Sequence, residues 1–425
     1  MRRLGSTGPL AVPAYRWLFT GQVVSAVGDQ LFPIAVVALV VTRGGNAGEL
    51  GLVLATRFAA LVLFAVLGGV WADRLPRVLM MRAADLLRLV AVAGLALAAA
   101  TGDPPTPVLA ALVFVVGAGE AFFRPAYGAL LPTVLPARDL PAGNALSEAS
   151  QYVAQVAGPG LAGALLLISG PGVVFALDAL TFAVSLATLF KVVEPPHQKA
   201  VRRRLHREIA EGITAVRQRS WIAAVLAMAS VQLMFAVAPA MVLLPLILRD
   251  NGQSPSTYGL VLAVGAVGGL LGAVAAGRWQ PAHPGQAGLL TLLGWTAPPL
   301  ALLLQAPVPV LAAAWFVGGA GLGPFNIWWA SALQTAVPRE LLARVVSLDW
   351  LFSLALLPLG LALTGPAVAL VGRGPVLVTA VVAMVVTSVL PLLVAGVRDL
   401  QNPVSKAVSD DSSPTERGYL RTELR

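Results

Sequence analysis

Twelve apolar runs divide the chain, and short polar segments separate them. The runs lie at residues 15–41, 49–71, 79–101, 107–131, 144–168, 172–192, 220–248, 257–277, 286–305, 308–332, 345–370 and 375–397. A helix needs about 20 predominantly apolar residues to cross the hydrocarbon core of a bilayer, and every run reaches that length. The pattern predicts twelve transmembrane helices. The first run is too long for the apolar part of a cleaved signal peptide, so we expect a true span there.

Part of this pattern occurs twice. The string Gly-Leu-Val-Leu-Ala fills residues 51–55 and 259–263, and in both places the apolar run closes on small residues and an arginine. Residues 129–136 align with residues 331–338 and share Leu, Thr and Pro at equivalent positions. A membrane protein built from two related six-helix halves can rock them about a shared central site, so the duplication points to transport.

The polar interruptions set the expected domain boundaries. We expect a six-helix bundle over 1–192, a basic linker over 193–219, a second bundle over 220–400 and a disordered cytoplasmic tail over 401–425. Within the linker, apolar residues at helical spacing predict a short amphipathic helix at 205–216 along the membrane surface. That helix is either a specific lipid or regulatory site or a basic segment that only touches lipid headgroups.

Composition and charge agree with a membrane protein. The chain is 57% hydrophobic and 12% charged, whereas soluble domains carry about 25% charged residues. Of the 29 Lys and Arg residues, 23 lie in segments on the side of the two termini, which predicts that both termini are cytoplasmic. This bias accounts for the net charge of +9, so nucleic-acid binding has no place in the interpretation.

Composition also argues against disulfides, metal sites and nucleotide-driven reactions. The chain has no Cys and three His, all in predicted loops, so we expect neither disulfides nor a metal site. It lacks the Gly-rich loop with Lys-Ser/Thr that holds a nucleotide, which argues against ATP-driven pumping and hydrolysis. We therefore expect no enzyme activity and no cofactor.

The segment after the second run carries a motif. Residues 69–77 read Gly-Val-Trp-Ala-Asp-Arg-Leu-Pro-Arg. This string resembles the signature of the major facilitator superfamily, in which a Gly and small residues precede Asp-Arg and Gly-Arg. Pro76, Trp71 and Val78 stand where the superfamily usually has Gly, Leu and a basic residue. The resemblance covers nearly the whole chain, over residues 15–397.

The fifth run carries a second motif of that superfamily. Gly158-Pro159 followed by Ala162-Gly163 resembles the antiporter motif of the drug:proton branches, with Ala154 in place of an expected Gly. Proline inside a helix removes a backbone hydrogen bond and bends the helix, while small residues permit close packing. We expect a bent, tightly packed helix that limits leak; an ordinary transmembrane kink is the alternative.

Two further strings narrow the resemblance to the macrolide-efflux and enterobactin-exporter-like group: Gly-Gln-Val-Val-Ser-Ala-Val-Gly-Asp at 21–29 and Ala-Phe-Phe-Arg-Pro-Ala at 121–126. The resemblance implies an all-α integral membrane protein with twelve transmembrane helices in two pseudo-symmetric six-helix bundles around a central cavity. It implies a bacterial cell-membrane protein that exports an amphipathic organic compound, such as a drug, natural product or siderophore, by proton-coupled alternating access. We expect a monomer whose partners are this substrate, protons and membrane lipids. A nutrient or metabolite permease stays open as the alternative, and a membrane-embedded enzyme or receptor is less favoured.

Charged residues inside the predicted spans carry the main hypothesis, because each costs about 2.5–3.5 kcal/mol near a helix centre on insertion scales. Asp29 lies near the middle of the first span, Glu120 and Arg124 lie past the middle of the fourth, and Arg57 and Asp178 lie in the outer thirds of the second and sixth. Glu120 and Arg124 share one helix face at i,i+4. If they face a cavity, a carboxylate at Asp29 or Glu120 can take up and release the coupling proton. The alternatives are a static Glu120–Arg124 pair, direct substrate contact, or an Asp29–Arg124 pair.

The motif after the second run is the predicted gate. Asp73 lies at a helix C-terminus, where the helix dipole disfavours an anion, so it needs a cationic partner. Arg77 or the region of Arg344 can supply one, and the contact would hold the two halves together on the cytoplasmic side. Gly69 and Arg74 complete the motif. The alternative is that Asp73 only orients its loop and keeps the same contacts in every conformational state.

Polar residues within the spans are the candidates for a substrate cavity. Asn326 aligns with an arginine of the first half, and Trp328 follows it; one polar group beside aromatics suits an amphipathic ligand. Tryptophans in transmembrane helices more often serve packing or lipid-facing belts. Gln151, Gln155 and Gln232 are further polar groups inside the predicted helices.

Overall fold

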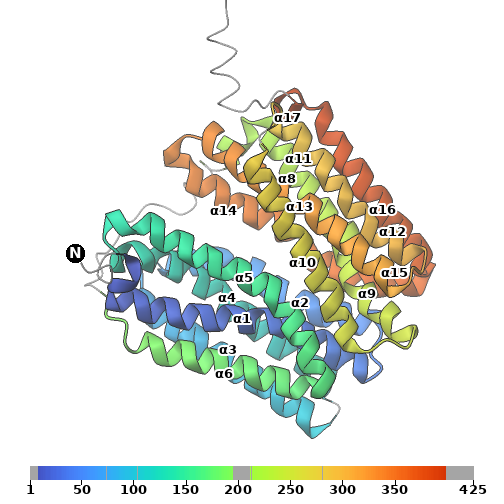
Figure 1. Ribbon diagram of the computed structural model, residues 1–425, viewed down its shortest axis with the longest axis horizontal. Coiled ribbons are helices and arrows are strands. Elements are labelled where there is room, and N and C mark those ends of the chain that lie inside the picture. The colour runs from blue at the N-terminus through green and yellow to red at the C-terminus, as the bar shows by residue number, and fades with distance from the viewer. Residues whose placement is uncertain are drawn as a thin grey trace, which may run out of the picture.

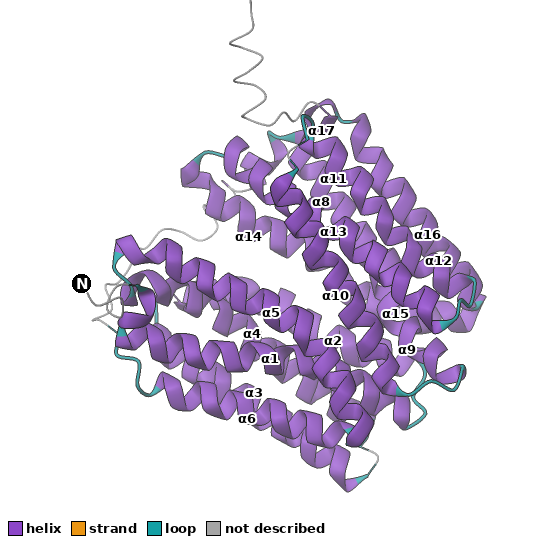
Figure 2. Cartoon of the chain, in the orientation of Figure 1, coloured by secondary structure: helices purple, strands orange, loops and turns teal. Residues whose placement is uncertain are grey.

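The first half of the chain folds into six long helices. The computed structural model describes residues 8–72, 74–102, 104–194, 211, 213–279 and 281–398, and every regular element within them is a helix (Figure 2). The long helices of the first half are α1 (Pro13–Thr42), α2 (Ala47–Ala72), α3 (Arg77–Thr101), α4 (Thr106–Val134), α5 (Leu140–Ile168) and α6 (Pro171–Leu189).

The second half contains six further spans, three of them built from two helices. The helices are α8 (Ser220–Gln232), α9 (Ala238–Asp250), α10 (Pro255–Arg278), α11 (Pro284–Leu292), α12 (Ala297–Leu303), α13 (Val308–Ala336), α14 (Arg339–Ala355), α15 (Leu357–Val371), α16 (Arg373–Val389) and α17 (Ala395–Arg398). Within the described residues, twelve helical segments are long and apolar enough to cross a membrane, which confirms the twelve spans expected from the apolar runs.

The interrupted spans restart at prolines. A π-helical turn separates α8 from α9, a 3-10 turn separates α11 from α12, and Leu356 separates α14 from α15. The second helix of each pair carries a proline in its first turn: Pro239, Pro298 and Pro358. Proline lacks the N–H that a regular helix needs in its interior but fits a first helical turn. The apolar runs predict these spans but not the breaks inside them.

The helices form two bundles that meet at one end and diverge at the other. In Figure 1, α1–α6 form the lower bundle and α8–α17 the upper one. The bundles converge where α2 and α10 begin, and they separate toward the end that carries the marked N-terminus.

The repeated string lies at the contact between the bundles. Gly51 in α2 and Gly259 in α10 each stand four residues after the first residue of their helix. A Cβ atom added to Gly51 would lie 2.2 Å from the carbonyl oxygen of Leu361, and one added to Gly259 would lie 2.8 Å from that of Pro159. Both copies of the string therefore use glycine to bring a helix backbone against the opposite bundle, at pseudo-symmetric positions.

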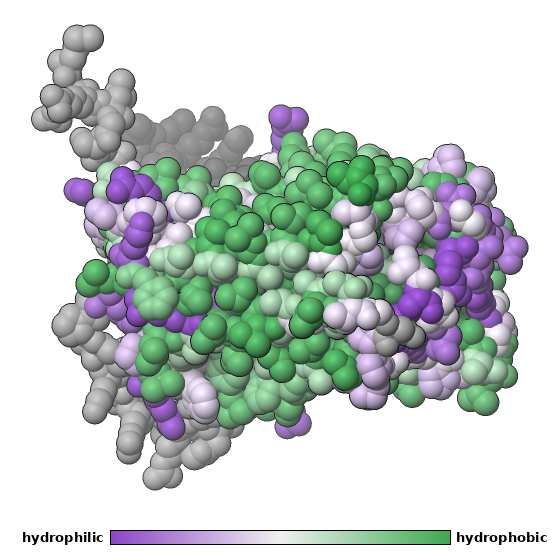
Figure 3. Space-filling model, turned by 90° about the horizontal axis from the view of Figure 1, so that it is seen from below, coloured by the Kyte–Doolittle hydropathy of each residue, from purple (hydrophilic) through white to green (hydrophobic). Residues whose placement is uncertain are grey.

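The surface suits a lipid environment. In the face shown in Figure 3, apolar residues fill the middle of the molecule and polar residues gather toward its two ends. This distribution and the twelve spans make the chain a multi-pass membrane protein.

Most of the predicted surface helix at 205–216 and the whole tail at 401–425 lie outside the described residues. Within that helix, Glu211 and residues 213–216 are described and helical.

Candidate functional site

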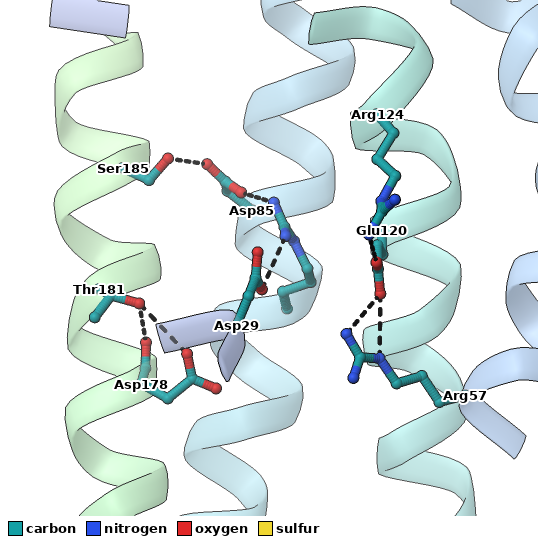
Figure 4. A network of polar contacts seen from close by, with 9 residues as sticks. Asp29, Arg57, Asp85, Glu120, Arg124, Asp178, Thr181 and Ser185 are labelled. Atoms are coloured by element: carbon teal, nitrogen blue, oxygen red, sulfur yellow. Dashed lines mark hydrogen bonds and ion pairs between the residues drawn. The ribbon is translucent and has the colours of Figure 1, made fainter. Parts of the chain in front are cut away.

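Charged side chains from five helices gather inside the first bundle (Figure 4). We call this group the charge network. Its members are four carboxylates (Asp29, Asp85, Glu120 and Asp178) and three guanidinium groups (Arg57, Arg88 and Arg124). They come from α1, α2, α3, α4 and α6.

Glu120 forms ion pairs with two arginines. Its Oε2 accepts hydrogen bonds from Nε and Nη2 of Arg57 at 3.1 and 2.9 Å, and its Oε1 accepts one from Nη2 of Arg124 at 2.5 Å. The predicted pairing of Glu120 with Arg124 is thus confirmed. The Arg57 side chain is 16% exposed and that of Arg124 is 59% exposed, and the Arg124 guanidinium lies 5.4 Å from the ring centre of Trp350 in the second bundle. Arg124 is therefore the member of the network that reaches the bundle interface.

Asp29 pairs with Arg88 and not with Arg124. The Arg88 guanidinium lies 3.6 Å from Oδ1 of Asp29, donates to Asp85, and stacks between the rings of Phe123 and Phe182. Gly119 makes this position possible, since a Cβ there would lie 2.6 Å from Cγ of Arg88. Arg88 can thus lie against α4 and reach α1, whereas Arg124 turns toward the other bundle.

The sequence analysis did not include Asp85 and Arg88 among the site residues. Asp85 is fully buried, and its second carboxylate oxygen accepts a hydrogen bond from Ser185 of α6 at 2.7 Å. The signal was the string Asp85-Leu-Leu-Arg88 inside an apolar run, because side chains at i and i+3 of a helix are neighbours.

Asp178 is fully buried on α6 and faces α1. The hydroxyl of Thr181 donates to its Oδ1 at 3.4 Å. A Cβ atom added to Gly28 of α1 would lie 2.3 Å from that same oxygen. The carboxylate therefore occupies space that only a glycine on α1 leaves free.

A cavity of about 500 Å³ lies between α5 and the second bundle. Its walls come from α5, the α8–α9 span, α10, the α11–α12 span and α13, and they are mostly apolar. Tyr258, Trp295 and Trp315 contribute aromatic rings, and Gln155 and Asn326 contribute polar groups. We call this space the apolar cavity. The structure confirms that the predicted residues Gln155 and Asn326 line it.

Three other predicted cavity residues do not line the apolar cavity. Gln232 is buried and its Nε2 donates to Oγ of Ser388 on α16 at 3.1 Å. Trp328 is also buried and packs edge-on against Trp279 at 5.4 Å. It lies two positions beyond Asn326 on α13, and helix residues two apart do not share a face. The third, Gln151, is half-buried on α5 and does not belong to the cavity lining.

The antiporter motif places α5 between two neighbouring helices. A Cβ added to Gly158 would lie 2.3 Å from Cβ of Gln30 on α1, and one added to Gly163 would lie 2.9 Å from the carbonyl oxygen of Ser256 on α10. The tight packing expected at this motif is confirmed. The helix continues through Pro159 without interruption.

The predicted gate motif lies where the bundles are apart. Asp73 falls outside the described residues. Gly69 borders open space, and Arg74 is exposed in the turn after α2.

The two arginines expected to partner Asp73 have other partners. Nη1 of Arg77 lies 3.6 Å from Oε1 of Glu194, whose carboxylate also accepts the backbone N–H groups of Arg77 and Val78 at 3.2 and 3.0 Å. Glu194 thus caps the N-terminus of α3, where the helix dipole favours an anion. Nη1 of Arg344 lies 2.6 Å from Oε2 of Glu211. In this structure neither arginine joins the two bundles.

In the described part of the chain, no cluster of three or more His, Cys, Asp or Glu side chains is arranged to hold a metal ion. The arrangement provides an apolar cavity between the two bundles and buried charge inside the first bundle.

A family model described as a transmembrane secretion effector matches residues 4–416. The chain belongs to the major facilitator superfamily. Two members of known name align along most of its length. It is 28% identical over 421 residues to the multidrug efflux pump Tap of Mycobacterium tuberculosis, covering 93% of this chain and 98% of that protein. It is 24% identical over 355 residues to macrolide efflux protein A of Streptococcus pyogenes, covering 82% and 87% respectively. These relatives agree with a multi-pass protein of the bacterial cell membrane.

Solved structures show the same superfamily fold. A bacterial homologue of the iron transporter ferroportin in the inward-facing state superposes with a TM-score of 0.66 at 19% identity, covering 89% of this chain and 98% of that chain. The outward-facing state of the same homologue superposes with a TM-score of 0.59 at 20% identity, and the two coverages are the same.

Proposed function

We propose that this protein exports amphipathic organic compounds from the cytoplasm in exchange for protons, by alternating access between its two bundles. The observation that carries the proposal is the pairing of an apolar cavity, which lies between α5 and the second bundle, with a buried charge network in the first bundle. Asp29 and Arg124 are the members of the network with the most exposed side chains, at 33% and 59%. A substrate can thus bind in the cavity while a proton binds in the network.

The cavity suits an organic compound with a large apolar body. Ligand sites for small molecules measure about 300–1,000 Å³ and are lined by apolar and aromatic side chains with few polar groups. The apolar cavity has this size and lining, with Gln155 and Asn326 as its polar groups. The relatives named as multidrug and macrolide efflux proteins support export of such compounds over uptake of a nutrient.

The orientation follows from the basic residues. If both termini are cytoplasmic, as the Lys and Arg distribution indicates, the bundles separate on the cytoplasmic side and are in contact on the other. The higher TM-score against the inward-facing ferroportin homologue supports this orientation of the opening. The cavity then loads its substrate from the cytoplasm or the inner leaflet.

The proton gradient is the proposed source of energy, and no cofactor is needed. The charge network supplies carboxylates that can exchange protons within a single chain, so the protein can work as a monomer. Closing the separated end and opening the glycine contacts at Gly51 and Gly259 would carry the substrate across the membrane.

Everted membrane vesicles with an imposed pH gradient test this proposal, with erythromycin and ethidium as probes. We expect either compound to dissipate the gradient in vesicles that contain the parent protein. Asn326→Leu removes a polar group of the cavity and should weaken the response. The control Leu167→Trp changes a side chain that is 70% exposed on α5 and outside the cavity, and it should respond as the parent does. Erythromycin uptake into vesicles without proton movement would refute the exchange and favour a permease.

A further inference from the structure

Two buried polar atoms of opposite character lack hydrogen-bond partners inside the charge network. They are Oδ2 of Asp178, on α6, and Nε of Arg88, on α3. Buried polar atoms in native structures almost always have partners, so each exception needs an explanation. Helices α3 and α6 pack against each other, and a donor and an acceptor thus stand unpaired in the same network.

Asp178 also differs from the other carboxylates of the network. Asp29, Asp85 and Glu120 each pair with at least one arginine. Asp178 receives only the hydroxyl of Thr181, at 3.4 Å, and its side chain is fully buried. An ionised carboxylate without a partner in an apolar interior is very costly, and such a group takes up a proton instead.

The charge balance leads to the same residue. Four carboxylates face three guanidinium groups, so the fully ionised network carries one excess negative charge. One bound proton makes the network neutral. Because the arginines already pair with the other three carboxylates, Asp178 is where that proton fits.

We propose that Asp178 holds a proton in this conformation and releases it when a movement of α6 along α3 brings its carboxylate to Nε of Arg88. In the release step the O–H bond of the carboxyl group breaks, and the proton passes to water by way of the partly exposed Asp29. The carboxylate that forms then accepts the Arg88 N–H. This role for Asp178 as the carrier of the coupled proton rests on the proton exchange proposed above.

The charged groups that act on Asp178 come from three helices. Asp29 on α1 carries a charge of the same sign as the ionised carboxylate, while Arg88 on α3 and Arg57 on α2 carry the opposite charge. Because Arg57 is bound by Glu120 and Arg88 by Asp85, the attraction is already shared with other anions. The carboxyl group lies directly against Gly28 of α1, where a Cβ atom would clash with its Oδ1.

Infrared spectroscopy of the full-length protein in lipid nanodiscs tests this assignment without a substrate. A protonated carboxyl group gives a C=O stretching band that an ionised one lacks. We expect this band at neutral pH in the parent, its loss in Asp178→Asn, and its retention in the control Asp250→Asn. The control makes the same substitution at a carboxylate that pairs with Arg249 and Arg373 outside the charge network, so it leaves the charge balance of the network unchanged. A band that persists unchanged in Asp178→Asn, or a parent without the band, overturns the proposal.

A second measurement separates this proposal from the proposed function. Asp178→Asn should still bind erythromycin, measured by fluorescence of the tryptophans in the cavity, but should no longer move protons when erythromycin is added to vesicles. Proton movement equal to that of the parent would overturn the role of Asp178 and leave the exchange intact. A parent that moves no protons would instead refute the exchange, while the infrared band would still report on Asp178.

Discussion

Replacing Glu120 with Gln tests how strongly the charge network stabilises the first bundle. Gln keeps the shape of the side chain but removes its charge, so Arg57 loses the carboxylate that binds both its Nε and its Nη2. The Glu120 side chain is 7% exposed and that of Arg57 is 16% exposed. Removing one partner of a buried ion pair costs about 3–5 kcal/mol, because the other charge stays buried without compensation.

The same reasoning gives a much smaller cost for the second partner of Glu120. Arg124 is 59% exposed, and exposed ion pairs contribute about 0–1 kcal/mol. Arg124→Gln should therefore change stability little. The double variant Arg57→Met/Glu120→Gln should recover most of the stability lost in Glu120→Gln, because it removes both charges of the buried pair.

Thermal unfolding of the purified variants in detergent measures these differences as changes in Tm. We expect a large decrease for Glu120→Gln, little change for Arg124→Gln and recovery of most of the lost Tm in the double variant. A decrease for Arg124→Gln as large as that for Glu120→Gln would refute the reasoning, and so would a double variant whose loss equals the sum of the single losses.

Three further predictions follow from specific contacts. A Cβ added to Gly160 would lie 3.6 Å from Cβ of Ala263, within the usual Cβ–Cβ range for a disulfide of about 3.5–4.5 Å. The chain has no native cysteine, so Gly160→Cys/Ala263→Cys should form a single disulfide under oxidation. That disulfide should block transport until it is reduced. A pair that resists oxidation would contradict the observed contact of α5 with α10. Gln232→Leu leaves Ser388 without its buried donor and should lower stability by about 1–3 kcal/mol without altering which compounds are transported; a changed substrate profile would return Gln232 to the cavity. Glu194→Gln weakens the cap of α3 and should lower the free energy of unfolding by about 0.5–2 kcal/mol, measured by thermal unfolding, and an unchanged Tm would argue against the cap.

The fold was largely predictable from the sequence because length and apolar content determine whether a segment can span a membrane. The repeat at residues 51–55 and 259–263 indicated two related halves, and the structure shows why the string begins with glycine. Close approach between bundles permits no side chain at Gly51 or Gly259.

The direction of individual side chains was harder to predict. Gln232 stands directly before the π-helical turn at Leu233–Val237. A π-turn adds a residue and changes which side chains share a face, and no pattern in the sequence marked it. Trp328 was placed in the cavity because of its neighbour Asn326, although the rotation between them puts the two on different faces of α13. These assignments depend on three-dimensional packing that hydrophobic patterns do not contain.

The charge network was predictable in part. Asp29, Glu120 and Arg124 were predicted because they lie near or past the middle of apolar runs. Asp85 and Arg88 were not included among the site residues, although they form an ion pair within one helix turn as Glu120 and Arg124 do. The link from Arg88 to Asp29 depends on the absence of a side chain at Gly119 on a third helix, which no local sequence pattern reveals.

The separation of the apolar cavity from the charge network affects how this protein can evolve. Most of the cavity lining belongs to the second bundle and carries no charged side chain, whereas the proposed proton site lies wholly within the first. Substitutions along α10 and α13 can therefore reshape the apolar cavity without disturbing the acids and arginines of the proposed proton site. Selection by a new toxic compound would act first on the second bundle, so that variants with altered resistance profiles accumulate there while the first bundle stays constant.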